Sequence, residues 1–244
     1  MDVIVSRSYP ERAEARAFED AVGAAFASET GSDVLVVPHL YHIAEQDGVW
    51  AELAALAGPL MVLCWMYPRP VEWVLRRHGI GEVGLSVADL STFDDVAQCL
   101  DACSAQVDRT PCDGSIRELA ADISGRWHPV LDYSRCINCG QCLQFCLFGV
   151  FALDEEGVVR ATEPDNCKLG CPACSRVCPR GAIMFPLYRK DDAMAGAPGQ
   201  FVTPDDAARR MFEQRTKRLH KQAPADDDLD ALIDDLDRLA ERGL

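Results

Sequence analysis

Two cysteine-rich blocks between residues 136 and 178 restrict the fold of this chain more than any other feature. In the first block two, two and three residues separate successive cysteines, and in the second three, two and three. Four thiolates must surround a metal centre tetrahedrally, and a short loop reaches only three corners, so the fourth ligand must come from elsewhere. The first block contains Cys136, Cys139, Cys142 and Cys146, and the second contains Cys167, Cys171, Cys174 and Cys178.

Three chemistries use such blocks: iron–sulfur clusters, zinc sites and disulfides. No N-terminal signal peptide is visible, so we expect a cytoplasmic chain, in which disulfides are rare. Zinc accepts four cysteines, and two blocks could hold two zinc ions. The first block packs three thiolates into a short loop with a fourth cysteine close behind, which suits a cubane cluster better. Zinc and disulfides stay open as alternatives.

Residues 131–188 resemble a bacterial-type two-cluster ferredoxin domain, an α+β fold with pseudo-twofold hairpins and short helices. The resemblance implies electron transfer by two 4Fe–4S clusters, each taking the last cysteine of the other block. Leu147 stands where the family usually has proline, and the second block has one extra residue between Cys167 and Cys171. The implied ligands are Cys136, Cys139, Cys142 and Cys178 for cluster 1, and Cys146, Cys167, Cys171 and Cys174 for cluster 2.

Residues 1–112 alternate between short apolar runs and helical patterns. This alternation predicts an α/β domain with a mainly parallel sheet. The expected strands are 3–6, 33–37, 60–64 and 83–87, and the expected helices are 10–28, 48–56, 70–78 and 92–107.

The rest of the chain divides by composition. Residues 113–130 read as a connector with one short helix over 115–123, and residues 131–190 form the cluster domain. Residues 191–203 are small and contain Pro and Gly, which indicates a linker. Residues 204–244 predict a two-helix tail whose last helix has an apolar stripe. The stripe either packs on its own domain or docks in a partner's groove.

Ligands of parallel sheets bind beyond the carboxyl ends of the strands. The residues expected there include Arg7, His39, His42, Tyr67 and Arg69, which would suit an anionic or planar ligand or an acidic partner surface. Alternatively, each loop is separately solvated. No glycine-rich phosphate loop and no catalytic set can be identified, so no catalytic residue is predicted.

Four cysteines lie outside the two blocks: Cys64, Cys99, Cys103 and Cys112. Cys99 and Cys103 share one face of an expected helix, and a third metal site is conceivable. Because that face also carries valines, we favour buried, metal-free cysteines.

The net charge of −15 argues against nucleic acid as a partner and favours docking on basic protein surfaces. The longest apolar runs are too short to span a membrane. We therefore expect an electron-transfer protein, acting as redox partner or subunit of a larger oxidoreductase. The alternatives are an oxidoreductase whose N-terminal domain binds a substrate or organic cofactor fed by the clusters, and a cluster-bearing scaffold or sensor.

Overall fold

The computed structural model describes residues 1–103, 114–123 and 125–199. The predicted two-helix tail and Cys112 therefore lie outside the described residues. These described residues belong to one compact unit. In the described part of the chain, every helix is too short or too polar to cross a membrane.

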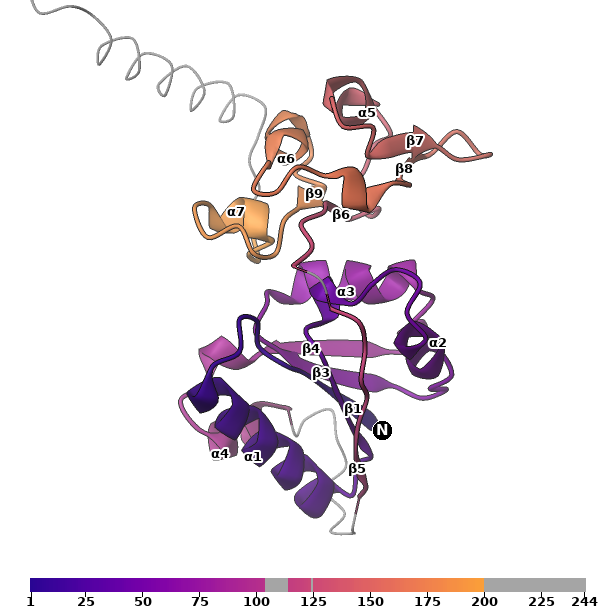
Figure 1. Ribbon diagram of the computed structural model, residues 1–244. Helices are drawn as coiled ribbons and strands as arrows, with labels where there is room; N and C mark the ends of the chain where they lie inside the picture. The colour runs from indigo at the N-terminus through magenta and orange to yellow at the C-terminus, as the bar shows by residue number, and fades with distance from the viewer. Residues whose placement is uncertain (104–113, 124, 200–244) are drawn as a thin grey trace, which may run out of the picture. The chain divides into compact units, whose positions relative to one another are not determined.

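A five-stranded parallel sheet organises the first half of the chain (Figure 1). Its strands, in spatial order, are β4 (Leu85–Asp89), β3 (Leu60–Cys64), β1 (Asp2–Ser6), β2 (Val34–Val37) and β5 (Ile116–Glu118). The central strands are almost continuous apolar runs because helices cover both faces, as is usual for parallel sheets. The predicted parallel α/β layer is confirmed.

The two faces of the sheet carry separate cores. Val3 and Val5 of β1 point to one face and pack with Phe26 of α1 (Ala13–Thr30) and with α4 (Val96–Cys103). Ile4 points to the other face, where α2 (Val49–Ala54) and α3 (Pro68–Arg77) pack. Figure 1 shows these helix pairs on opposite sides of the sheet. This alternation follows from the two-residue period of a strand.

The predicted short helix over 115–123 is wrong. Residues 116–118 form β5, which pairs in parallel with β2 and places Ile116 opposite Val34. The three residues are exposed and have no apolar alternation, so the strand depends on the open edge of β2. The segment expected as a connector thus supplies the fifth strand. β4 also begins later than expected, because its pairing with β3 starts at Leu85, opposite Leu60, and Val83 is left 71% exposed.

The helix expected over 92–107 is shorter in the described residues. A 3₁₀ turn at Leu90–Thr92 comes first, and α4 then runs from Val96 to Cys103. The Asp89 carboxylate accepts a hydrogen bond from Ser91 N, which begins the turn.

The second half of the unit is α+β, as the resemblance implied. It contains β6 (Val130–Leu131), α5 (Gln141–Phe145), β7 (Phe151–Leu153), β8 (Val159–Ala161), α6 (Ala173–Val177) and β9 (Ile183–Met184). β6 pairs antiparallel with β9, and β7 with β8. Each cysteine block contains one short helix, and α5 packs against α6.

Residues 191–199, the described part of the expected linker 191–203, contain a short helix. α7 (Asp192–Ala195) begins there, and the Asp191 carboxylate accepts hydrogen bonds from Ala193 N and Met194 N. Met194 is buried, and its carbonyl accepts a hydrogen bond from Phe185 N at 2.8 Å. The segment around α7 therefore packs on the cluster domain and extends it.

Side-chain contacts join the two halves. Val130 and Met184 belong to the same apolar cluster as α3. Arg126 Nη1 donates to Ile43 O at 2.7 Å, while its Nε donates to Asp165 Oδ1 at 2.7 Å. The cysteine blocks are thus attached to the face of the sheet that α2 and α3 cover.

Candidate functional site

The first cysteine block is a tight loop that leads into α5. Asn138 and Gly140 have positive φ angles of 54° and 72°. Glycine and asparagine tolerate this left-handed conformation better than other residues. The Asn138 side chain also fixes the loop to the β7–β8 hairpin, because Nδ2 donates to Gly157 O at 2.7 Å and Oδ1 accepts from Val159 N at 2.8 Å.

The second block has a different loop before α6. Its extra residue is accommodated by a turn in which Cys171 N donates to Lys168 O at 3.0 Å and Gly170 has a φ of 73°. Trp127 Nε1 donates to Cys171 O at 3.1 Å, which anchors the loop from outside the block.

Two separate hollows lie beside these loops, and four cysteines line each one. The first hollow is lined by three cysteines of the first block and the last cysteine of the second: Cys136, Cys139, Cys142 and Cys178. The second is lined by the last cysteine of the first block and three of the second: Cys146, Cys167, Cys171 and Cys174. These two groups have the same members as the crossed ligand sets that the resemblance implies.

A buried apolar cluster packs beside both hollows. Leu131, Phe151, Ile183 and Phe185 are buried there, and several of the cysteines pack against them. Burial raises the pKa of Cys142 to about 11 and that of Cys167 to about 12, so both thiols are protonated near neutral pH in the metal-free chain. Iron that binds them must displace protons. Four sulfur donors in an apolar setting fit a 4Fe–4S cluster.

The hydrogen bonds around the sulfur atoms matter for such a site. Ala182 N donates to Cys178 Sγ at 3.3 Å. Hydrogen bonds to cluster sulfurs, together with burial, help to set the reduction potential.

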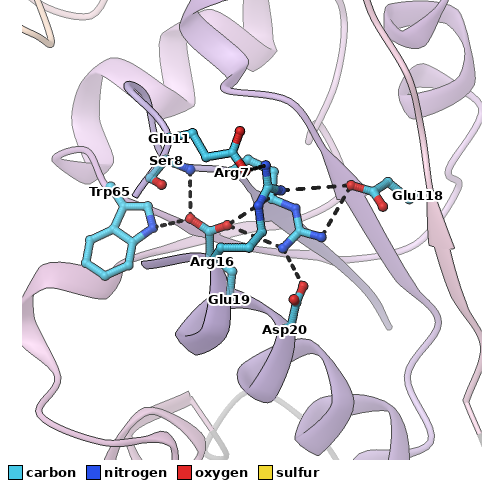
Figure 2. A network of polar contacts seen from close by, with 8 residues as sticks. All are labelled: Arg7, Ser8, Glu11, Arg16, Glu19, Asp20, Trp65 and Glu118. Atoms are coloured by element: carbon cyan, nitrogen blue, oxygen red, sulfur yellow. Dashed lines mark hydrogen bonds and ion pairs between the residues drawn. The ribbon is translucent and has the colours of Figure 1, made fainter. Parts of the chain in front are cut away.

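The residues expected at the strand ends do not all lie in one site. Arg7 lies beside Glu19, Asp20 and Glu118, and Figure 2 shows this network at the ends of β1 and β3. Glu19 is fully buried; its carboxylate accepts hydrogen bonds from Ser8 N at 2.7 Å and Trp65 Nε1 at 2.8 Å. The chain's own carboxylate thus occupies the position where an anionic ligand would meet Arg7.

His39 and His42 are buried neighbours, with ring centroids 4.9 Å apart, and Tyr9 packs on His42 at 4.2 Å. Burial, with His42 nearby, lowers the pKa of His39 to about 3. Arg69 contacts the cluster domain instead: its Nη1 donates to Gly181 O at 3.2 Å. Tyr67 precedes α3, where burial and Asp192 raise its pKa. The structure brings the two histidines together, but each arginine has its own partners.

The three described cysteines outside the blocks lie in the cores. Cys64 belongs to the core on one face of the sheet, and Cys99 and Cys103 belong to the core on the other face. Burial raises the pKa of the Cys64 thiol to about 12. The adjacent Cys103, together with burial, raises the pKa of Cys99.

Three positioning residues were not identified from the sequence: Asn138, Trp127 and Glu19. The only local signal for Asn138 is that asparagine adopts the left-handed conformation more readily than most other residues. The contacts of Trp127 and Glu19 depend on tertiary packing and leave no local signal.

Comparison with known proteins finds the 4Fe–4S dicluster domain at residues 135–182. A ferredoxin of Methanocaldococcus jannaschii is 46% identical over 66 residues, which cover 27% of this chain and 43% of that protein. Ferredoxin-3 of Nostoc sp. is 36% identical over 67 residues, covering 20% of this chain and 68% of the relative. The pyruvate synthase subunit PorD of M. jannaschii is 38% identical over 63 residues, covering 25% of this chain and 71% of that subunit.

The similarity is therefore confined to part of each protein. This chain spans less than half the length of the first ferredoxin, and the domain match does not include residues 1–134. No solved structure matches the chain.

Proposed function

We propose, from the premise that this chain belongs to the family of 4Fe–4S dicluster ferredoxins through residues 135–182, that it is the electron-transfer subunit of a larger oxidoreductase. The domain match indicates two 4Fe–4S clusters, and the relatives include ferredoxins and a subunit of pyruvate synthase. Bound clusters supply one-electron transfer.

The division of the cysteines between two hollows is the observation that carries this proposal. It supports Cys136, Cys139, Cys142 and Cys178 as the ligands of cluster 1, and Cys146, Cys167, Cys171 and Cys174 as the ligands of cluster 2. Zinc would require one metal ion for each group of four, whereas the family match favours clusters.

The two short helices provide the connection between the hollows. Cys142 lies in α5 and lines the first hollow, while Cys146 directly follows α5 and lines the second. Cys174 in α6 and Cys178 after α6 repeat this relationship in the opposite sense. Each helix therefore joins a ligand of one cluster to a ligand of the other, which favours electron transfer between them.

An apolar surface beside the second hollow supports a protein partner at that point. Leu147 is 90% exposed and Leu169 is 75% exposed, and both line the hollow together with Phe145. Large exposed apolar residues that gather in one place are typical of interaction sites. A partner that covers them would approach cluster 2. The apolar stripe in the sequence of the last 41 residues is a second candidate docking element.

The clustered thiols support a cytoplasmic location, because disulfides are rare there.

Metal analysis tests the cluster assignment. Anaerobically purified protein should contain about eight irons and eight acid-labile sulfides per chain. Cys139→Ser and Cys171→Ser should each remove about half of the iron, because they alter different clusters, whereas Cys103→Ser should leave the iron content unchanged. Stoichiometric zinc without labile sulfide would overturn the proposal.

A reductive titration tests electron transfer. Electron paramagnetic resonance during a dithionite titration should detect one-electron reduction of each cluster, with only one signal left in Cys139→Ser and in Cys171→Ser. A chain that holds iron but shows no reducible signal would instead be a structural scaffold.

A second candidate function is an oxidoreductase whose α/β layer binds a substrate or an organic cofactor supplied with electrons by the clusters. A cavity between the sheet helices and the cluster domain supports this candidate.

A further inference from the structure

A cavity of about 530 Å³ lies between α3 and the segment that leads into the cluster domain. Its walls come from α2, from α3, from the loop after β2, from residues 126–133 and from β8. The volume is within the range of about 300–1,000 Å³ that is usual for small-molecule sites. None of the eight block cysteines is among its lining residues.

The charge of the lining is opposite to that of the chain. Four arginines line the cavity, Arg76, Arg77, Arg126 and Arg160, against one acidic residue, Glu45. The whole chain has a net charge of −15. Burial lowers the pKa of His78 and of His128, so these two lining histidines add no positive charge near neutral pH. Three of these arginines pair with carboxylates, Arg77 with Glu45, Arg126 with Asp165 and Arg160 with Asp154. The four guanidinium groups therefore outnumber the carboxylates beside them by one, which leaves a small positive excess at the cavity.

Two buried polar groups in the lining have unused hydrogen-bonding capacity. Nη2 of Arg126 has no hydrogen-bond partner among the described residues and lies 3.8 Å from Glu45 Oε2. Within the same described ranges, His128 Nδ1 also has no partner. Both residues are at least nine-tenths buried, and both line the cavity. Buried polar groups are usually paired, so these two atoms are exceptions, and both are enclosed by neighbouring side chains rather than open to the cavity.

Flat side chains form much of the remaining wall. Trp50 stacks on His78 with ring centroids 3.9 Å apart, and Trp73 meets Tyr133 edge-on at 5.6 Å. Arg76 lies over the Trp73 ring at 5.5 Å, and Arg160 lies over the Tyr133 ring at 4.5 Å. Aromatic and guanidinium planes together favour a flat ring with an attached anionic group.

We propose that this cavity binds a planar heteroaromatic molecule that carries a phosphate group. The ring lies among the tryptophans and Tyr133, and the arginines hold the phosphate, since a guanidinium matches phosphate oxygens in a bidentate geometry. Side chains supply all of this recognition, which is consistent with the lack of a glycine-rich phosphate loop in the sequence.

The cavity shares one wall residue with each of the two cysteine hollows. Leu131 lines the cavity and the first cysteine hollow, and Pro129 lines the cavity and the second. A ring bound here is separated from each cluster site by a shared wall residue. The binding proposal itself does not depend on electron transfer.

Equilibrium dialysis of the anaerobically purified, cluster-containing full chain tests the proposal. The probes are flavin mononucleotide and AMP, each compared with its dephosphorylated form, riboflavin or adenosine. At least one phosphorylated probe should bind with a Kd below about 1 mM and about tenfold or more tightly than its dephosphorylated form. The flavin and adenine arms distinguish the two sources of a phosphorylated ring.

Matched variants locate the site. Arg76→Gln/Arg160→Gln should weaken binding of that probe by about tenfold or more. Arg12→Gln is the control, because Arg12 lies over Trp65 at 5.4 Å in a similar cation–π contact and does not line the cavity. Iron content, measured on every sample, separates a binding defect from cluster loss.

Three results would overturn the inference. These are the absence of binding by all probes, equal affinity with and without the phosphate, and equal effects of the double variant and Arg12→Gln.

Discussion

The guanidinium of Arg69 lies 3.4 Å from the carboxylate of Asp132, and this ion pair joins the start of α3 to the segment just before the first cysteine block. Asp132 is 2% exposed, and its backbone carbonyl accepts a hydrogen bond from Cys136 N at 3.0 Å. The α/β layer therefore contacts the residue that holds the first cysteine of the first hollow in place.

Arg69→Gln should speed the release of iron to a chelator several-fold. The change leaves the buried Asp132 carboxylate with one cation fewer, which costs about 1–3 kcal/mol. The matched control is Arg117→Gln, whose pair with Glu52 is exposed and contributes about 0–1 kcal/mol. Equal release rates for the two variants would show that the Arg69 contact does not stabilise the cluster site.

Asn138 tests the loop of the first block. Asn138→Ala removes two side-chain hydrogen bonds and forces alanine into a positive φ, whereas Asn138→Gly removes the bonds alone. We expect Asn138→Ala to lower the stability of the loop by about 2–3 kcal/mol. Asn138→Gly should lower it by about 1–2 kcal/mol less than Asn138→Ala does. Chelator-dependent iron loss from cluster 1 measures both. Glycine and alanine variants with the same loss would exclude backbone strain as a cause.

Glu19→Gln should destabilise the α/β layer by about 2–4 kcal/mol, because it leaves Arg7 with one buried counter-charge fewer. Urea unfolding, followed by far-ultraviolet circular dichroism, measures the change. Glu14→Gln, an exposed position in the first turn of the same helix, should change the stability by less than about 1 kcal/mol. A Glu19 variant as stable as the Glu14 variant would contradict a stabilising role for the network in Figure 2.

The stability of the α/β layer should fall as the pH decreases below about 6.5. The pKa of His39 is about 3 in the folded chain, so the unfolded chain binds a proton in this range that the folded chain excludes. Between pH 7.0 and 5.5 one such histidine lowers the free energy of unfolding by about 1 kcal/mol. His39→Gln should remove this part of the decrease, and urea unfolding at the two pH values checks it. An identical decrease in the wild type and the variant would assign the pH dependence to other groups.

Some elements were predictable because their signal is local. β3 has the predicted bounds of residues 60–64, since a short, wholly apolar run is typical of a strand buried on both faces. β5 was missed because Ile116, Arg117 and Glu118 carry no strand pattern of their own; only the edge of β2 makes them a strand.

In the candidate site, too, the features with a local sequence signal were predictable and those that depend on tertiary contacts were not. The eight cysteines that line the two hollows could be selected from their spacing alone, because this spacing is typical of loops that surround a metal centre. Their assignment as cluster ligands stays a prediction. The surroundings of Arg7 and Arg69 were not predictable, since Glu19 and Asp132 meet them only through tertiary packing. The cavity beside α3 likewise combines five segments that lie apart in the sequence, so no local sequence pattern predicts it.

The position of β5 also bears on the order of assembly during synthesis. All five strands precede the first block cysteine, because β5 ends at Glu118 and the block begins at Cys136. Since the N-terminal part of a chain leaves the ribosome first, the sheet and its helices can begin to form before the cysteine blocks have emerged. The iron-binding segment then meets an existing surface, and the contacts of Arg69 and Arg126 give it a fixed position while its cysteines are still reduced and metal-free.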